Sequence, residues 1–153
     1  MVRLIKEFAN SRNDEIRKLK DVREILREHL MCIYYWRDTD CKNHWEGEIF
    51  SFLPIMSKLK MNHKYLSKKL IYENLFTDFA ETFYMDIHTY VEKLMYKEKG
   101  LPTIYDLDEK NLYKFLDDFY TEISDILADI GSVRKDVVYK IIEKLLKKYP
   151  YEI

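Results

Sequence analysis

The polar segment between Arg37 and Glu48 holds the side chains of this 153-residue chain that come closest to a chemical site. His44 and Glu48 lie four residues apart, so on a helix both side chains face one point, as two ligands of one metal ion must. A third ligand would have to come from elsewhere in the fold, and the candidates are His29, Cys41 and His88. We expect a local surface pair of His44 with Glu48, with a metal site as the alternative and no resident cofactor.

Arg37 and His44, with Asp38 beside the arginine, suggest a second chemistry. Their spacing resembles the Arg-His motif of the HEPN ribonuclease superfamily, whose members are small, all-helical and often dimeric. In that superfamily the arginine and the histidine act together on the RNA phosphodiester. The resemblance implies a metal-independent ribonuclease with Arg37, Asp38 and His44 as its site, and this is the alternative to a protein without a catalytic site.

The composition excludes several classes of protein. The balance of 26 Lys and Arg against 27 Asp and Glu argues against a general nucleic-acid binder. Three glycines leave little from which to build a phosphate-binding loop. The two cysteines, Cys32 and Cys41, favour a reducing, cytoplasmic compartment. We expect neither a membrane span nor a signal peptide, and the lack of Gln is typical of a hot or AT-rich source.

Helices must position these residues, because apolar residues recur at steps of three and four almost throughout the chain. The first pattern begins after a capping Asn13 and ends near Trp36. A short helix over residues 3–9 precedes it, either separate or continuous with it. Residues 37–43 have no apolar period, so we expect a loop there.

Two further helices follow the loop. Asn43 has capping-box spacing and predicts a helix from His44, which Pro54 should kink because proline removes a backbone hydrogen bond. A longer pattern runs from about Tyr65 to Gly100, where glycine followed by proline is the expected helix stop.

The last third of the chain predicts a helical hairpin with separated charges. Asp106 or Asp108 caps a fourth helix, and Ser132 caps a fifth. Residues 105–130 contain eight acids and two lysines, whereas residues 132–149 contain six basic residues and two acids. Since only a short turn joins them, the two helices should lie antiparallel and neutralise each other.

These elements predict an all-α single domain over residues 1–153, a bundle of five or six helices with the antiparallel hairpin over residues 105–150. One lysine cluster within the first hundred residues is a candidate contact for nucleic acid. It has no acid within it and comprises Lys58, Lys60, Lys64, Lys68 and Lys69.

A Trp pair frames the polar loop and carries a family resemblance over residues 5–91. The segment resembles the family catalogued as domain of unknown function 29, whose members show a helix with His-Leu, an aromatic-Trp step, a polar loop and then His-Trp with a following Glu-Ile. The matching residues are His29, Leu30, Tyr35, Trp36, Asn43, His44, Trp45, Glu48 and Ile49. The resemblance implies an all-helical fold and assigns no reaction.

We therefore expect a non-catalytic helical interaction or structural module that self-associates or binds a protein partner. The tyrosine content supports this expectation, because 13 tyrosines exceed what one core needs and tyrosine is favoured at protein interfaces. The HEPN-like ribonuclease is the alternative.

Overall fold

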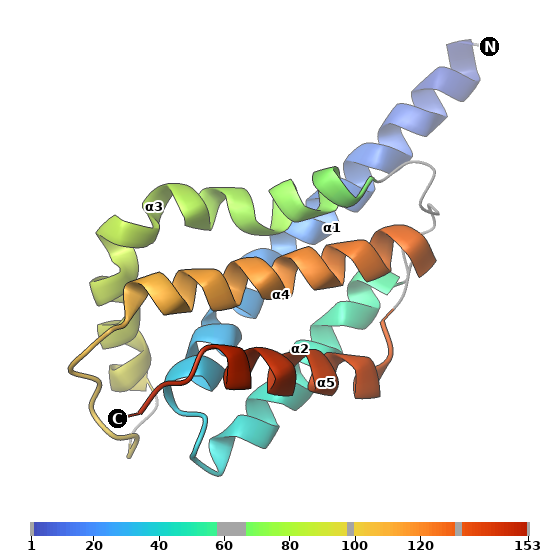
Figure 1. Cartoon of the computed structure of the whole chain (residues 1–153). Helices are drawn as coiled ribbons and strands as arrows, with labels where there is room; N and C mark the ends of the chain where they lie inside the picture. Colours follow the sequence, from blue (N-terminus) through green and yellow to red (C-terminus); the bar gives the residue numbers. More distant parts are fainter. Residues whose placement is uncertain (1, 58–66, 98–99, 131–132, 153) are drawn as a thin grey trace.

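The computed structural model of the chain describes residues 2–57, 67–97, 100–130 and 133–152, with the side chains of 16–17, 19–51, 67–76, 89, 91–96, 100–129 and 133–152. These residues form helices and connecting segments, and no strand occurs among them. The prediction of an all-helical chain is confirmed. Five helices are described (Figure 1), and they are α1 (Val2–Tyr35), α2 (Cys41–Ser57), α3 (Lys68–Lys97), α4 (Glu109–Ile130) and α5 (Lys135–Lys148).

The first two helices begin earlier than the sequence pattern predicts. Residues 3–9 belong to one continuous α1, so Asn13 lies inside that helix and caps nothing. Asn43 likewise lies inside α2 and not before it. The connecting turn is shorter because Thr39 closes it: its hydroxyl donates to the Trp36 carbonyl over 2.7 Å, and its own carbonyl accepts from the amide of Lys42 over 3.3 Å.

The later boundaries follow the turn residues. Gly100 has φ +88°, a conformation that glycine adopts without strain, and it follows the end of α3 as a helix stop should. Asp108 directly precedes α4, as one of the two predicted caps. The predicted N-cap of α5 is wrong, because Arg134 and not Ser132 occupies the N-cap position. Ser132 itself lies outside the described residues.

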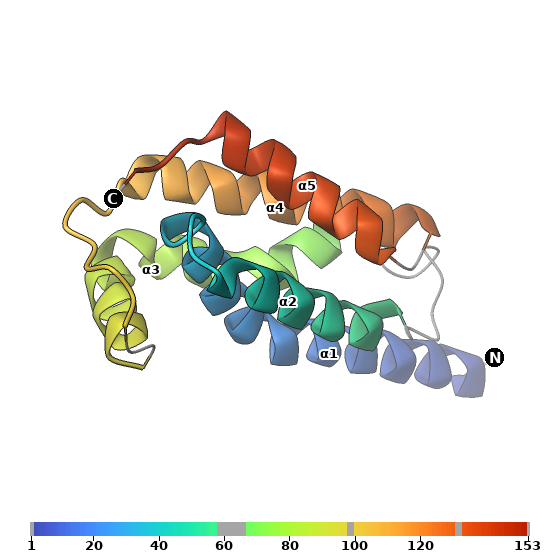
Figure 2. The same cartoon turned by 90° about the horizontal axis from the view of Figure 1, so that it is seen from below.

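Most of the helix–helix contacts involve α1 or α4. α1 contacts α2, α3 and α4, while α4 also contacts α3 and α5. α5 reaches α2 as well, so it closes one side of the structure. The N-terminal part of α1 extends beyond the other helices in both views (Figures 1 and 2).

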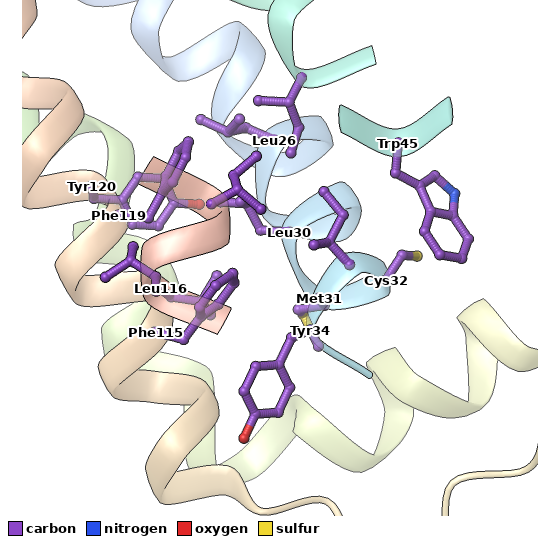
Figure 3. Close-up of a cluster of buried hydrophobic side chains, with 14 of the residues drawn as sticks. Leu26, Leu30, Met31, Cys32, Tyr34, Trp45, Phe115, Leu116, Phe119 and Tyr120 are labelled. Carbon is purple, nitrogen blue, oxygen red and sulfur yellow. The ribbon is translucent and has the colours of Figure 1, made fainter. Parts of the chain in front are cut away.

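The core takes buried side chains from all five helices, and one part of it lies between α1 and α4. Leu26 and Leu30 of α1 are buried against aromatic residues of α4 that include Phe115 and Phe119, as Figure 3 shows. Their spacing of three and four residues places them on one side of each helix. Each such side chain contributes roughly 1.5–3 kcal/mol through its removal from water, so this cluster fixes the ends of α1 and α4 that carry the polar groups described next.

Candidate functional site

Arg37, a predicted catalytic residue, binds backbone carbonyls at the ends of two helices. Its Nε donates to the Tyr34 carbonyl over 3.0 Å, and its Nη1 donates to the Leu146 carbonyl over 2.7 Å. The guanidinium carbon also lies 4.8 Å from the centre of the Tyr34 ring. A cation at helix C-termini is stabilised by the carbonyl groups left unpaired there. Arg37 therefore ties the end of α1 to the last turn of α5.

The other predicted site residues lie on the surface. His44 Nε2 is 3.8 Å from Glu48 Oε1, and the two side chains are 71% and 40% exposed. This is the local surface pair that the spacing predicts. Asp38 is exposed in the turn between α1 and α2. Within the described residues, no hydrogen bond or ion pair joins Arg37 to His44.

The lysine cluster is described only at its end. Lys58, Lys60 and Lys64 lie outside the described residues, whereas Lys68 and Lys69 begin α3. Lys68 Nζ lies 2.7 Å from Asp125 of α4, and Lys69 Nζ lies 3.9 Å from Glu73. Both described lysines therefore lie near carboxylates of the chain itself.

Four aromatic side chains hold the segment between α3 and α4 in place, and we call them the aromatic clasp: Tyr34, Tyr35, Trp36 and Tyr151. Trp36 Nε1 donates to the Pro102 carbonyl over 2.8 Å, and the Tyr35 hydroxyl donates to the Leu107 carbonyl over 2.6 Å. The remaining two bonds run from the hydroxyl of Tyr34 to Asp108 Oδ2 over 2.9 Å and from the hydroxyl of Tyr151 to the Asp106 carbonyl over 2.6 Å.

Burial favours the protonated form of the clasp tyrosines. Burial raises the pKa of Tyr34 well above its usual range, and the hydrogen bond to the Asp108 carboxylate raises it further. Burial also raises the pKa of Tyr35, together with the charges of Tyr151 and Tyr34. Tyrosine donates only while protonated, so these side chains act as fixed donors and not as acids or bases. Trp36 also packs on Trp45, with ring centres 6.2 Å apart.

Asp108 is the strained residue of this segment. Its φ is +44°, which is uncommon for a residue with a Cβ but tolerated best by Asn and Asp. Three bonds hold it: its amide donates to Asp106 Oδ1 over 3.1 Å, and its carboxylate accepts from Tyr34 and from Asn111 Nδ2, the latter over 3.3 Å. The clasp and the start of α4 thus share one carboxylate.

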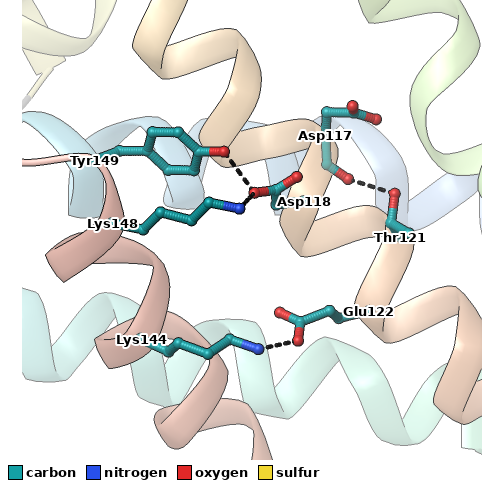
Figure 4. Close-up of polar contacts among 7 residues, drawn as sticks. All are labelled: Asp117, Asp118, Thr121, Glu122, Lys144, Lys148 and Tyr149. Carbon is teal, nitrogen blue, oxygen red and sulfur yellow. Dashed lines mark hydrogen bonds and ion pairs between the residues drawn. The ribbon is translucent and has the colours of Figure 1, made fainter.

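A polar seam joins α4 to α5 (Figure 4). Lys144 pairs with Glu122, while Lys148 Nζ lies 2.9 Å from Asp118 Oδ2. The Tyr149 hydroxyl donates to the same Asp118 oxygen over 2.6 Å. The predicted neutralisation between the acidic and the basic helix is confirmed for these pairs. A hollow of about 340 Å³ lies along the seam, and it is lined by Asp118, Thr121, Glu122, Lys144, Leu145 and Lys148.

Asp118 is the charge that the seam stabilises most clearly. Partial burial pushes its pKa upward, but the hydrogen bonds from Tyr149 and Lys148 and the charges of Lys148 and Lys144 outweigh burial and lower the pKa. Hydrogen bonds to the charged form of a carboxylate have this effect in general. The seam therefore depends on Asp118 being ionised.

A second polar junction joins α2 to α5. Lys42 of α2 pairs with Glu143 of α5, and it also lies 3.3 Å from Glu46 Oε1. Glu46 is only 5% exposed. Burial raises its pKa, and the charge and hydrogen bond of Lys42 oppose that rise. Arg37 and Lys42 thus hold α5 at neighbouring positions from the end of α1 and the start of α2.

The outer face of α5 carries two lysines outside the ion pairs of the described residues, next to charges that are already paired. We call Tyr139, Lys140, Glu143, Lys144 and Lys147 the α5 basic face; they line an open hollow of about 510 Å³. Lys140 and Lys147 are exposed and take part in none of the ion pairs among the described residues. Tyr139 lies under Lys135, whose Nζ is 5.6 Å from the ring centre. This face places Lys140 and Lys147 beside a tyrosine ring, and tyrosine is enriched at protein interfaces.

Sequence reasoning missed the aromatic clasp and the α5 basic face. The run of three aromatic residues at the end of α1 was a usable signal for the clasp, because buried Tyr and Trp require partners for their polar atoms. The partners themselves are mostly backbone carbonyls, which no sequence pattern reveals. For α5, the signal was the six basic residues against two acids in residues 132–149, but the sequence does not show which of those cations pair with acids of α4.

In the part of the chain that the structure describes, no three His, Cys, Asp or Glu side chains are grouped so that they could hold a metal ion. None of the helices described has a stretch both long and apolar enough to span a bilayer. No protein-family model, curated protein or solved structure matches this chain. The resemblances to domain of unknown function 29 and to HEPN ribonucleases therefore stay predictions.

Proposed function

We propose that this chain is a non-catalytic interaction module that binds an acidic segment of a protein partner on the α5 basic face. The observation that carries the proposal is the pair of exposed lysines, Lys140 and Lys147, beside Tyr139 on one helix face. An acidic segment would place carboxylates beside both lysines and apolar groups on the tyrosine ring. Charge complementarity of this kind sets partner choice and association rate.

The use of the other polar groups supports the proposal. Arg37, Asp118 and Lys42 each join two helices, so their charges contribute to the fold and are not free for a substrate. We infer that α4 and α5 form an antiparallel hairpin within a single helical bundle. The reverse order of the pairs Lys148 with Asp118 and Lys144 with Glu122 supports that arrangement. The hairpin would keep the α5 basic face turned outward.

Fluorescence anisotropy tests this proposal with a labelled peptide of alternating Glu and Tyr residues. We expect saturable binding that weakens as salt is raised, because exposed charges are screened. The double variant Lys140→Asp, Lys147→Asp should bind at least about tenfold more weakly. Lys20→Asp, at an exposed lysine of α1, is the matched control and should bind as the unaltered chain does. Equal binding by all three proteins would rule out the α5 basic face as the binding surface.

The ribonuclease with Arg37, Asp38 and His44 remains the alternative prediction. Incubation of the purified chain with single-stranded RNA tests it, and His44→Ala is the informative variant because His44 is exposed and its loss leaves the fold intact. Cleavage that His44→Ala abolishes would favour the ribonuclease over the interaction module.

A further inference from the structure

Carboxylates gather at the end of the molecule where the segment between α3 and α4 meets the C-terminal residues. Both segments lie at the same end in Figures 1 and 2, and the Tyr151 hydroxyl joins them by donating to the Asp106 carbonyl. The acidic end comprises Asp38, Asp106, Asp108, Glu109 and Glu152. Asp38 lies in the turn after α1, and Asp108 directly precedes α4 and accepts a hydrogen bond from Tyr34 at the end of α1. Asp38, Asp106 and Glu152 are exposed.

The side chain of Tyr105 is exposed to solvent at this acidic end. Its side chain is 91% exposed, although its neighbours Ile104 and Leu107 are buried. The aromatic clasp binds the backbone on both sides of it, at Pro102 and at Leu107. A tyrosine presented by a fixed backbone loses little conformational entropy on binding, and such side chains act as anchors at protein interfaces.

The acidic end complements the α5 basic face. It offers Asp106 beside an exposed aromatic ring, whereas the α5 basic face offers Lys140 and Lys147 beside a hollow of about 510 Å³. A contact of α5 with α5 would bring like charges together and is disfavoured. The bond from Tyr151 to the Asp106 carbonyl fixes the residues that follow α5 on the acidic end, so the two surfaces have a set position relative to each other on one chain. A two-fold axis can then form both contacts at once, because each copy meets the other through the same pair of surfaces.

We infer that the acidic partner of the α5 basic face is a second copy of this chain, an inference that rests on the proposed function. In this two-fold dimer the Tyr105 ring of one copy lies over the α5 basic face of the other. Lysine ammonium groups lie against the ring face, and Asp106 lies beside Lys140 or Lys147. Cation–π contacts with tyrosine are favourable, and charge complementarity selects this pairing of surfaces over a pairing of like charges.

Sedimentation velocity over a range of protein concentrations tests the dimer. The unaltered chain should change from monomer to dimer as its concentration rises. Asp106→Lys alone, and Lys140→Asp with Lys147→Asp, should each shift the transition to at least about tenfold higher concentration. Asp21→Lys and Lys20→Asp reverse exposed charges on α1 and are the matched controls. An unaltered chain that stays monomeric at every concentration overturns the inference.

Mixing the two charge-reversed chains gives the decisive result. Neither variant should pair with itself. In the mixture, the reversed charge of the Asp106→Lys chain should meet the reversed charges of the Lys140→Asp, Lys147→Asp chain. The unaltered α5 basic face of the first chain should meet the unaltered Asp106 of the second. A heterodimer should therefore form in the mixture. If the mixture stays monomeric while the unaltered chain dimerises, these two surfaces do not form the dimer.

The labelled acidic peptide separates the two proposals, because the Asp106→Lys chain should no longer dimerise but should still bind the peptide. If the Lys140→Asp, Lys147→Asp chain bound the peptide as tightly as the unaltered chain does, that result would instead count against the proposed function.

Discussion

The guanidinium of Arg37 donates a hydrogen bond to the backbone carbonyl of Leu146 over 2.7 Å, across 109 residues of chain. This bond satisfies a carbonyl in the last turn of α5, where helical partners run out. A second bond to the Tyr34 carbonyl makes the same side chain a connection between two helix ends. The residue that a short motif marks as catalytic is thus part of the scaffold.

Replacement of Arg37 by Met should destabilise the fold. The change keeps much of the side-chain volume but removes both charged donors, and a hydrogen bond to a charged group contributes about 1.5–3 kcal/mol. Two such bonds are lost from a half-buried side chain, so we expect the free energy of unfolding, measured in urea, to fall by at least about 2 kcal/mol. Arg134→Met is the control, because Arg134 is exposed and its one ion pair among the described residues is with nearby Asp136. Its effect should stay within about 0.5 kcal/mol, and an Arg37 variant equally mild would contradict the role assigned to Arg37.

Tyr35→Phe tests the aromatic clasp. The substitution removes the hydroxyl that donates to the Leu107 carbonyl and leaves the ring in the core. The buried carbonyl then lacks its partner, which costs about 1–3 kcal/mol. Thermal and urea unfolding should both show the loss. Tyr105→Phe changes the same group on an exposed ring and should have almost no effect on stability. A clasp that contributes nothing would give the two variants the same unfolding midpoint.

Asp108 should tolerate Asn far better than Val. Asn adopts positive φ readily and keeps an oxygen for Tyr34, whereas a β-branched side chain is strained at φ +44° and offers no acceptor. We expect Asp108→Asn to cost less than about 1 kcal/mol and Asp108→Val at least about 2 kcal/mol. Urea denaturation gives both values. A valine variant as stable as the asparagine variant would show that this backbone conformation carries no strain.

Asp118 should make stability depend on pH in the acid range. Its folded pKa lies below the ordinary value of 3.8, so the ionised form stabilises the fold at pH values above that value. This contribution is lost as the pH falls from the unfolded pKa through the lower folded pKa. We expect the unaltered chain to be more stable than Asp118→Asn at neutral pH. Unfolding curves at a series of pH values should show the difference shrinking as the solution becomes acidic. If the difference in the free energy of unfolding between the two proteins stayed constant with pH, ionised Asp118 would not be the source of the pH dependence.

The apolar spacing within the chain determined the helices. Leu19, Val22, Leu26 and Leu30 recur at steps of three and four, and all four are buried on one side of α1. Gly100 follows α3 and Asp108 precedes α4. Both residues have a positive φ, which glycine and aspartate tolerate better than most residues do. The sequence also determined the charges of α4 and α5, which pair across the seam. Capping patterns were less informative, since Asn13 and Asn43 both lie inside helices.

Only the tertiary structure decided what the polar side chains do. Arg37 reaches Leu146 and Tyr35 reaches Leu107, and in both bonds the acceptor is a backbone carbonyl. Every residue carries that group, so no residue type or spacing distinguishes the chosen partner. The same holds for Lys140 and Lys147, which look like any lysine of α5 until the fold assigns acids to Lys144 and Lys148. Local spacing determines which face of a helix is apolar, whereas the packing of distant segments determines which charges remain exposed.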